Sequence, residues 1–191
     1  MAQWMTHLRV AEQIAAAIPQ LDNEWFYFGN IAADSGRVIA NHTFLKLPSY
    51  DPPTQVTHWS YTPHKRSGSI QPDKFYDEYL KPQDDPFYFA DRKIAFYWGY
   101  FAHLLTDILW VDNIITPVKE RVKADQKAQP DQADHLAKIP RIDWSDIDAL
   151  FLEQHPKYRP LEIVRNMEPI QNDLLPYFDE TAMEEKRKEC L

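Results

Sequence analysis

One stretch of the sequence is apolar on nearly every face of the helix that it predicts. It runs from Ile94 to Val111 and is interrupted by His103 and Asp107. A helix that is hydrophobic all round lies in a protein core or in a membrane. This stretch is slightly short for a membrane span of roughly 20 residues. It therefore predicts a buried central helix, over about residues 86–111, and no transmembrane segment.

His103 and Asp107 place an imidazole and a carboxylate four residues apart on this helix. Residues at this spacing project from one face, with Cβ atoms about 5–6 Å apart. Their apolar neighbours predict that both side chains are buried, and a buried carboxylate is costly unless it is paired or binds a metal. Taken alone, the pair is explained somewhat better by a hydrogen bond inside a helical bundle than by half of a metal site.

Helical periodicity also predicts several shorter helices. The clearest runs from Thr6 to Ile18, with Thr6 as its N-cap and Pro19 as its end. Others are expected over residues 72–80, from Pro117 to about 128, from Asp143 or Ser145 to about 155, and from Pro160 onward. Residues 37–71 and 125–137 predict long connections, and we find no strand alternation. The expected fold is all-α, a multi-helix bundle in one domain over residues 1–191.

Composition excludes several kinds of site. The four glycines, at positions 29, 36, 68 and 99, form neither a Rossmann fingerprint nor a P-loop. The single cysteine, Cys190, excludes an intrachain disulfide, a thiolate-rich zinc site and an iron–sulfur cluster. The net charge of −8 argues against binding of a nucleic acid duplex. Any metal must therefore be held by His, Asp or Glu.

Three more residues suit a metal site. His7 lies beside the apolar stripe of the first helix, Asp34 precedes Ser35 and Gly36 in a turn, and His58 lies in a polar segment between prolines. Each alone has an ordinary explanation: a core histidine, a turn aspartate and an exposed histidine. With His103 and Asp107 they supply three imidazoles and two carboxylates, a set that suits zinc or another first-row divalent ion.

Four short segments occur in an order that resembles the zinc-dependent phospholipase C family. They are Trp4–His7, Gly29–Gly36, Thr57–Trp59 and Tyr100–Asp107, and they span roughly the first 110 residues. The family is all-helical, its members of known activity are zinc phosphodiesterases, and the fungal P1-type nucleases have a similar fold and site. The resemblance implies a short, bacterial-type member of this family.

The resemblance also implies roles for the five side chains. Asp34, His58, His103 and Asp107 would surround one zinc, and His7 would hold a second zinc that Asp107 bridges. Asp34 would orient or deprotonate the attacking water. In the family the second ion also takes the backbone of an N-terminal tryptophan, whereas Trp4 here follows three residues.

The ligands of a further zinc in the family have no match here. Val111, Asp112 and Asn113 stand where a histidine is expected, and His135 lacks an acidic residue four positions on. Asp112 is a candidate substitute ligand. We therefore expect one well-formed zinc site and a second, weaker one.

These features predict a zinc-dependent hydrolase, similar to phospholipase C and acting as a phosphodiesterase on a small phosphate ester through a metal-activated water. Two alternatives are a helical module with a structural metal site and a metal-free interaction domain. Arg37 is close enough to Asp34 in sequence to contact a phosphate, but a surface arginine is the simpler interpretation. The first residues lack the pattern of a signal peptide, which predicts a cytoplasmic protein. The many aromatic residues would permit a homodimer.

Overall fold

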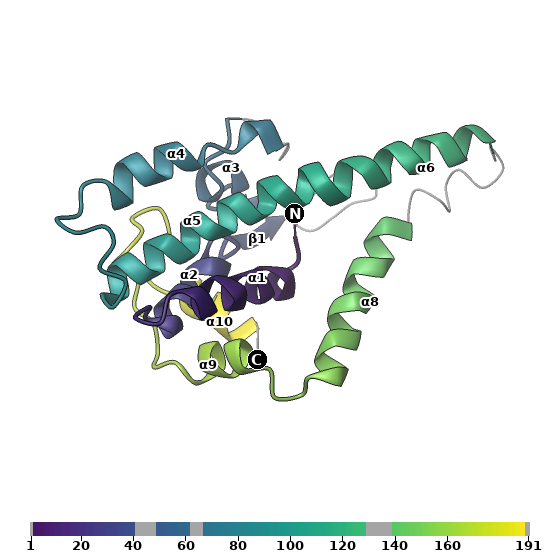
Figure 1. The fold of residues 1–191 in the computed structure, drawn as a ribbon. Coiled ribbons are helices and arrows are strands. Elements are labelled where there is room, and N and C mark those ends of the chain that lie inside the picture. The colour runs from purple at the N-terminus through teal and green to yellow at the C-terminus, as the bar shows by residue number, and fades with distance from the viewer. Residues whose placement is uncertain (1, 41–48, 62–66, 129–138, 190–191) are drawn as a thin grey trace.

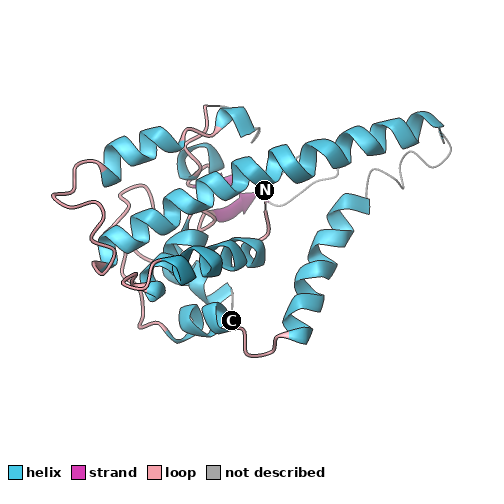
Figure 2. Cartoon of the chain, viewed as in Figure 1, coloured by secondary structure: helices cyan, strands magenta, loops and turns pink. Residues whose placement is uncertain are grey.

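The computed structural model describes residues 2–40, 49–61, 67–128 and 139–189, and their arrangement is mostly helical (Figures 1 and 2). This confirms the predicted all-α class. The positions of His42, His64, His135 and Cys190 lie outside the described residues, as does most of the connection predicted over 125–137.

The helical elements are α1 (Trp4–Ala17), α2 (Asn23–Ala32), α3 (Thr54–Thr57), η1 (Ser67–Ser69), α4 (Pro72–Phe75), η2 (Tyr76–Leu80), α5 (Arg92–Trp110), η3 (Val111–Ile115), α6 (Thr116–Ala128), α8 (Ile139–Gln154), α9 (Arg159–Asn166) and α10 (Ala182–Glu189).

Helix α5 is the central helix, and it packs most closely against α2. Two glycines allow this approach. A Cβ atom at Gly29 would lie 2.2 Å from the carbonyl oxygen of Phe96, and one at Gly99 would lie 2.2 Å from that of Phe26. The two backbones therefore cross where neither helix carries a side chain.

Helix α5 begins at Arg92, so the start predicted near residue 86 is wrong. The Asp91 side chain caps the helix by accepting hydrogen bonds from the backbone N–H groups of Lys93 (2.9 Å) and Ile94 (3.0 Å). The residues just before Asp91 form turns and not a helix. Among them, the Phe89 carbonyl accepts a hydrogen bond from the N–H of Asp22 at 2.9 Å. A local cap thus sets the boundary, which the apolar pattern extends too far.

The central helix continues through η3 into α6, as the long helix in Figure 1 shows. Pro117 was expected to start a separate helix. A proline removes one helical hydrogen bond and crowds the carbonyl four residues earlier. The carbonyl four residues before Pro117 belongs to Asn113, which lies in the π-helical η3 (Val111–Ile115) and not in regular α-helix. By length and composition this helix could cross a membrane, but 61% of its most apolar stretch is buried, as in a core helix.

The segment after Asp34 contains two strands, which the sequence pattern did not predict. Strand β1 (Arg37–Ala40) pairs antiparallel with β2 (Ser49–Asp51), with Arg37 opposite Asp51 and Val38 opposite Tyr50. Four and three residues are too few to establish an alternation of buried and exposed side chains.

Other boundaries also differ from those predicted. Helix α1 begins at Trp4 with Gln3 as its N-cap, α2 replaces an unassigned aromatic segment, and α8 begins at Ile139, ahead of both predicted caps. Helix α10 lies within the region expected to be helical from Pro160 onward, and before it Asp179 accepts hydrogen bonds from the N–H groups of Thr181 and Ala182.

Candidate metal centre

The structure brings the five predicted side chains together from four parts of the chain. His7 comes from α1, Asp34 lies two residues beyond α2, His58 directly follows α3, and His103 and Asp107 come from α5. The side chains of His7, His58, His103 and Asp107 have no exposed surface, whereas that of Asp34 is 18% exposed. The centre therefore reaches solvent on the Asp34 side.

The donor atoms of Asp34, His58 and His103 lie within 4.8 Å of one another, and Asp107 lies near the two histidines of this group. His58 Nε2 lies 3.3 Å from Asp34 Oδ1, 3.2 Å from His103 Nε2 and 3.7 Å from Asp107 Oδ2. His103 Nε2 lies 3.9 Å from Asp107 Oδ2. Tetrahedral zinc with bonds of about 2.0–2.2 Å holds its ligand atoms about 3.3–3.6 Å apart. The separations of His58 from Asp34 and His103 are close to these values, and the two that involve Asp107 are slightly longer.

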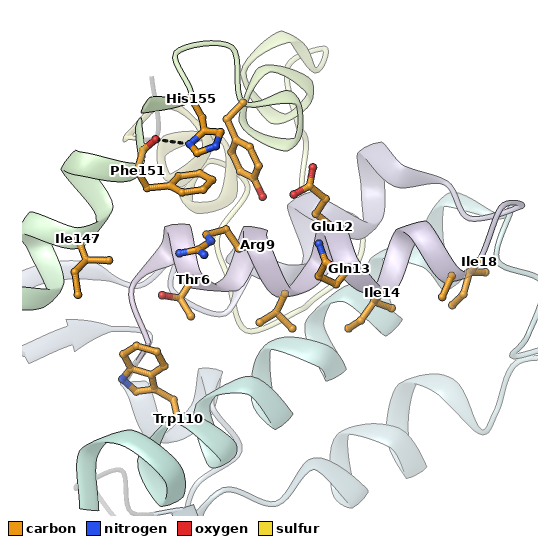
Figure 3. Close-up of a pocket in the computed structure, with 13 residues that line it drawn as sticks. Thr6, Arg9, Glu12, Gln13, Ile14, Ile18, Trp110, Ile147, Phe151 and His155 are labelled. Atoms are coloured by element: carbon orange, nitrogen blue, oxygen red, sulfur yellow. Dashed lines mark hydrogen bonds between the residues drawn. The ribbon is translucent and has the colours of Figure 1, made fainter. Parts of the chain in front are cut away.

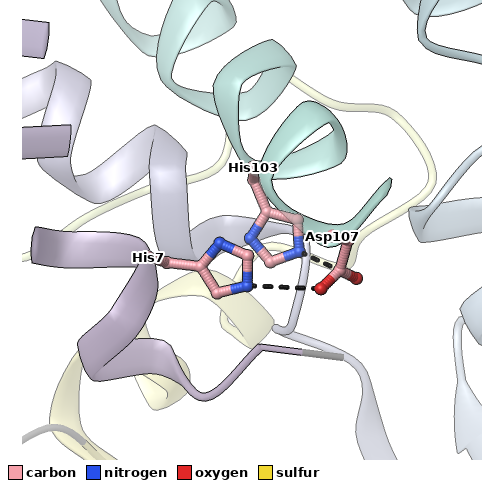
Figure 4. Close-up of side chains that lie close together, drawn as sticks. All are labelled: His7, His103 and Asp107. Atoms are coloured by element: carbon pink, nitrogen blue, oxygen red, sulfur yellow. Dashed lines mark ion pairs between the residues drawn. The ribbon is translucent and has the colours of Figure 1, made fainter. Parts of the chain in front are cut away.

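A second group consists of His7, His103 and Asp107, whose donor atoms lie within 4.8 Å of one another. Figure 4 shows His7 and His103 side by side, with both rings directed toward Asp107. The rings stack at 3.8 Å, and His7 Nε2 lies 3.5 Å from Asp107 Oδ1. Among the described residues, neither ring nitrogen of His7 nor Oδ2 of Asp107 has a hydrogen-bond partner. Buried polar atoms without partners are costly, so these atoms fit a bound cation.

Hydrogen bonds behind the centre orient two of the imidazoles. His103 Nδ1 lies 2.7 Å from the backbone oxygen of Asn30 and donates its proton to it, which leaves the Nε2 lone pair facing the centre. Thr57 Oγ1 lies 2.8 Å from His58 Nδ1 and can orient that ring in the same way. The Tyr100 hydroxyl donates a hydrogen bond to the Thr57 carbonyl. Each ring thus presents Nε2 to the same point.

The charges of the centre also suit a metal. Burial, with the nearby His7, lowers the pKa of His103 well below its ordinary value, so this imidazole is neutral. Burial alone would raise the pKa of Asp107, but the neighbouring His7, His103 and His58 hold the pKa of this carboxyl well below its ordinary value. A neutral imidazole and an ionised carboxylate are the forms that bind a divalent cation.

The chain before α1 covers one side of the centre. The backbone N–H of Ala2 donates a hydrogen bond of 2.9 Å to Asp107 Oδ1, and Ala2 is only 4% exposed. Trp4 lies two residues further on, in the first turn of α1. Sequence reasoning did not find this contact or the one from Asn30, because backbone atoms make both and any residue type can supply them.

Two other candidates lie elsewhere. Arg37 forms ion pairs with Asp179 and Glu185, so its guanidinium is engaged by carboxylates of this chain. Asp112 is exposed on η3 and belongs to neither group of metal-binding side chains among the described residues, so the structure gives no support to it as a substitute ligand.

A groove of about 1030 Å³ runs along the outer face of α1, between this helix and α8 (Figure 3). Thr6, Trp110 and Ile147 line one end, and the Arg9 guanidinium lies 4.5 Å from the centre of the Phe151 ring. The five candidate ligands do not line this groove, so it is separate from the metal centre.

A buried central helix whose histidine and aspartate converge with side chains from its neighbours defines a helical protein with a candidate metal centre. The family model for zinc dependent phospholipase C matches residues 6–110, more than half of the chain, and this range includes all five side chains. The chain belongs to the zinc-dependent phospholipase C family. Comparisons with curated proteins and with solved structures gave no match. The family implies zinc, while the role of each side chain stays a prediction.

Proposed function

We propose that this protein is a zinc-dependent hydrolase of phosphate esters. Asp34, His58, His103 and Asp107 would hold one zinc, and His7 with Asp107 a second, weaker one. The observation that carries the proposal is that His58 Nε2 lies 3.2–3.7 Å from donor atoms of Asp34, His103 and Asp107, and that His103 Nε2 lies 3.9 Å from Asp107. Family membership supports zinc as that ion.

Three of the four side chains around the first ion would only hold it, whereas Asp34 would both bind the ion and act on the attacking water. When bound, zinc neutralises phosphoryl oxygens and lowers the pKa of a coordinated water. The fully buried His58, His103 and Asp107 would hold the ion, and the hydrogen bonds with Thr57, Asn30 and Ala2 keep these side chains in place. Asp34 alone is reached by solvent, so its carboxylate is placed to orient a water and to accept its proton.

The substrate class follows from the same centre. A phosphodiester offers the anionic oxygens that a divalent cation attracts, and the family name points to phospholipid headgroups among such esters. We expect small soluble phosphodiesters to react as well, because only their phosphate group needs to contact the metal centre.

Zinc analysis and a substrate panel test this proposal. Protein purified without chelator should contain at least one equivalent of zinc and should hydrolyse at least one phosphodiester in the panel. Asp34→Asn should lower kcat by a factor of at least 100 at saturating zinc. Asp112→Asn, an exposed aspartate outside the centre, serves as the matched control and should retain full activity.

A structural zinc site is the second candidate, because four of the five side chains are fully buried and Ala2 covers Asp107. In that case zinc is bound stoichiometrically, its removal lowers the melting temperature, and every ester in the panel stays at the background rate. That combination of results would reject the hydrolase and keep the metal.

A further inference from the structure

The side of α5 opposite the metal centre carries apolar side chains that meet solvent. Leu105 is 39% exposed and Leu109 is 60% exposed, and both point away from His103 and Asp107 on the helix. Trp98 and Phe101 precede them on the same side at helical spacing and are only partly buried. A single exposed leucine is ordinary, but a continuous apolar row marks an interaction surface.

Two aromatic residues extend this row at the start of α5. Phe87 and Tyr88 are each 59% exposed. The Phe87 ring lies 5.9 Å from the Trp98 ring, which in turn lies 5.5 Å from Phe101. We call Phe87, Trp98, Phe101, Leu105 and Leu109 the outer apolar row.

Helix α6 continues the same long helix and is basic (Figure 1). Lys119, Lys123 and Lys127 recur every fourth residue, which places them along one side, and all three are exposed. With the exposed Arg121, and against Glu120 and Asp125, they give α6 a net charge of +2 in a chain whose net charge is −8. A helix with a net positive charge thus follows directly, on the same long helix, from the part of α5 that carries the exposed Leu105 and Leu109.

We propose that the outer apolar row and the basic α6 form one docking surface for an anionic lipid membrane. Leucine and aromatic side chains insert between headgroups, and lysines beside them attract anionic headgroups. A second copy of the chain is a poorer partner, because two basic α6 helices would repel each other. The surface lies on the opposite side of α5 from His103, and its docking does not depend on hydrolysis at the metal centre.

Vesicle sedimentation of the intact, zinc-loaded protein tests this surface. Vesicles containing phosphatidylglycerol should bind the protein, pure phosphatidylcholine vesicles should bind it far less, and added salt should weaken the binding. Soluble phosphate ester released in the same samples is measured separately. If the protein hydrolyses the soluble ester but does not bind the anionic vesicles, the docking surface is rejected and the proposed hydrolase activity is not.

Matched variants identify the residues involved. The double variant Lys119→Gln/Lys123→Gln should weaken binding to anionic vesicles about 30-fold, and Leu105→Ser/Leu109→Ser should weaken it at least about tenfold. The controls Lys74→Gln/Lys157→Gln and Leu150→Ser make the same chemical changes at exposed positions outside the surface and should bind normally.

Four results would overturn the proposal. They are the absence of binding to anionic vesicles, equal binding to neutral ones, equal weakening by the control variants, and a dimer in solution that Leu105→Ser/Leu109→Ser dissociates. The last result would assign the same face to self-association.

Discussion

At the scale of single residues, the metal centre depends on atoms that do not face the metal. His58 lies at the end of the four-residue helix α3, which is too short to hold an imidazole by itself. Trp59, with a φ of 51°, reverses the chain directly after it, and its ring packs on Phe75 and Tyr79. From the other side, the buried Tyr100 hydroxyl holds the Thr57 carbonyl. Tyr100 is therefore a positioning residue for His58.

Replacement of Tyr100 by phenylalanine tests this role. The variant loses one buried hydrogen bond, so we expect the free energy of unfolding to fall by about 1 kcal/mol and zinc affinity to fall at least about tenfold. Tyr97→Phe is the matched control, because the Tyr97 hydroxyl donates a buried hydrogen bond to the Leu174 carbonyl, away from the centre. Chemical unfolding and zinc titration of both variants give the comparison. Equal zinc affinity in the two variants would contradict the positioning role.

The same residues show what the sequence could predict of the site. Histidine and aspartate are chemically distinctive, so His7, Asp34, His58, His103 and Asp107 were recognisable as candidates. Their convergence is a property of the tertiary structure, and only the resemblance to a family indicated it in advance. The contacts from Asn30 and Ala2 use backbone atoms, for which no residue type gives a signal.

At the scale of elements, the crossing of α2 and α5 sets the distance between Asp34 and His103. Asn30, on α2, donates its side-chain N–H to the Gly99 carbonyl at 3.1 Å, while its own carbonyl accepts from His103. Helical periodicity predicted α5 as a buried helix. It did not predict this crossing, because Gly29 and Gly99 act by letting the backbone of the other helix come close, and the sequence does not show which helix that is.

Gly99→Ala tests the crossing. The new methyl group would meet the Phe26 carbonyl at 2.2 Å and the Asn30 nitrogen at 2.9 Å, so the helices must separate. We expect the free energy of unfolding to fall by at least about 3 kcal/mol, the upper end of ordinary overpacking. Gly68→Ala is the control, since a Cβ atom there meets nothing within 4 Å. Thermal unfolding of the two variants decides the matter, and equal stabilities would mean that the helices adjust without cost.

Helix α10 depends on a carboxylate for its attachment to the chain after α9. Glu184 accepts hydrogen bonds from the backbone N–H of Ile170 (3.1 Å) and from the Arg187 guanidinium (2.7 and 2.8 Å), and Arg187 also donates to the Arg165 carbonyl. The Arg187 hydrogen bonds lead in lowering the pKa of Glu184 from 4.5 to about 2, against the opposing effect of burial.

Acid should therefore weaken this attachment in a defined range. Because the pKa is lower in the folded state, the stabilisation is complete above pH 4.5 and is lost as the pH falls toward about 2. Glu184→Gln should lower the free energy of unfolding by about 1.5–3 kcal/mol at neutral pH, and the difference from the parent should shrink through that range. Glu180→Gln, at a neighbouring exposed position, should change little. A difference independent of pH would mean that the charge of Glu184 does not matter.

At the scale of the whole molecule, the metal centre joins segments that are far apart in the sequence. Two bound ions would together link α1, the end of α2, the end of α3 and the middle of α5, from residue 7 to residue 107. Without the ion, one carboxylate oxygen and both nitrogens of a buried histidine lack hydrogen-bond partners among the described residues. Loss of zinc should therefore affect the stability of the entire fold.

The expected size follows from linkage. A ligand present at 100 times its dissociation constant stabilises the folded state by about 2.7 kcal/mol, which corresponds to a rise in melting temperature of about 5–10 °C for a chain of this length. Calorimetry with zinc and with chelator measures this difference. Asp107→Ala should abolish it, because the carboxylate proposed to bridge both ions is removed. The variant should also destabilise the metal-free protein, because it leaves a cavity beside the buried His7 and His103. Full zinc occupancy, or an unchanged rise in melting temperature, in Asp107→Ala would show that the ion is held without the shared carboxylate.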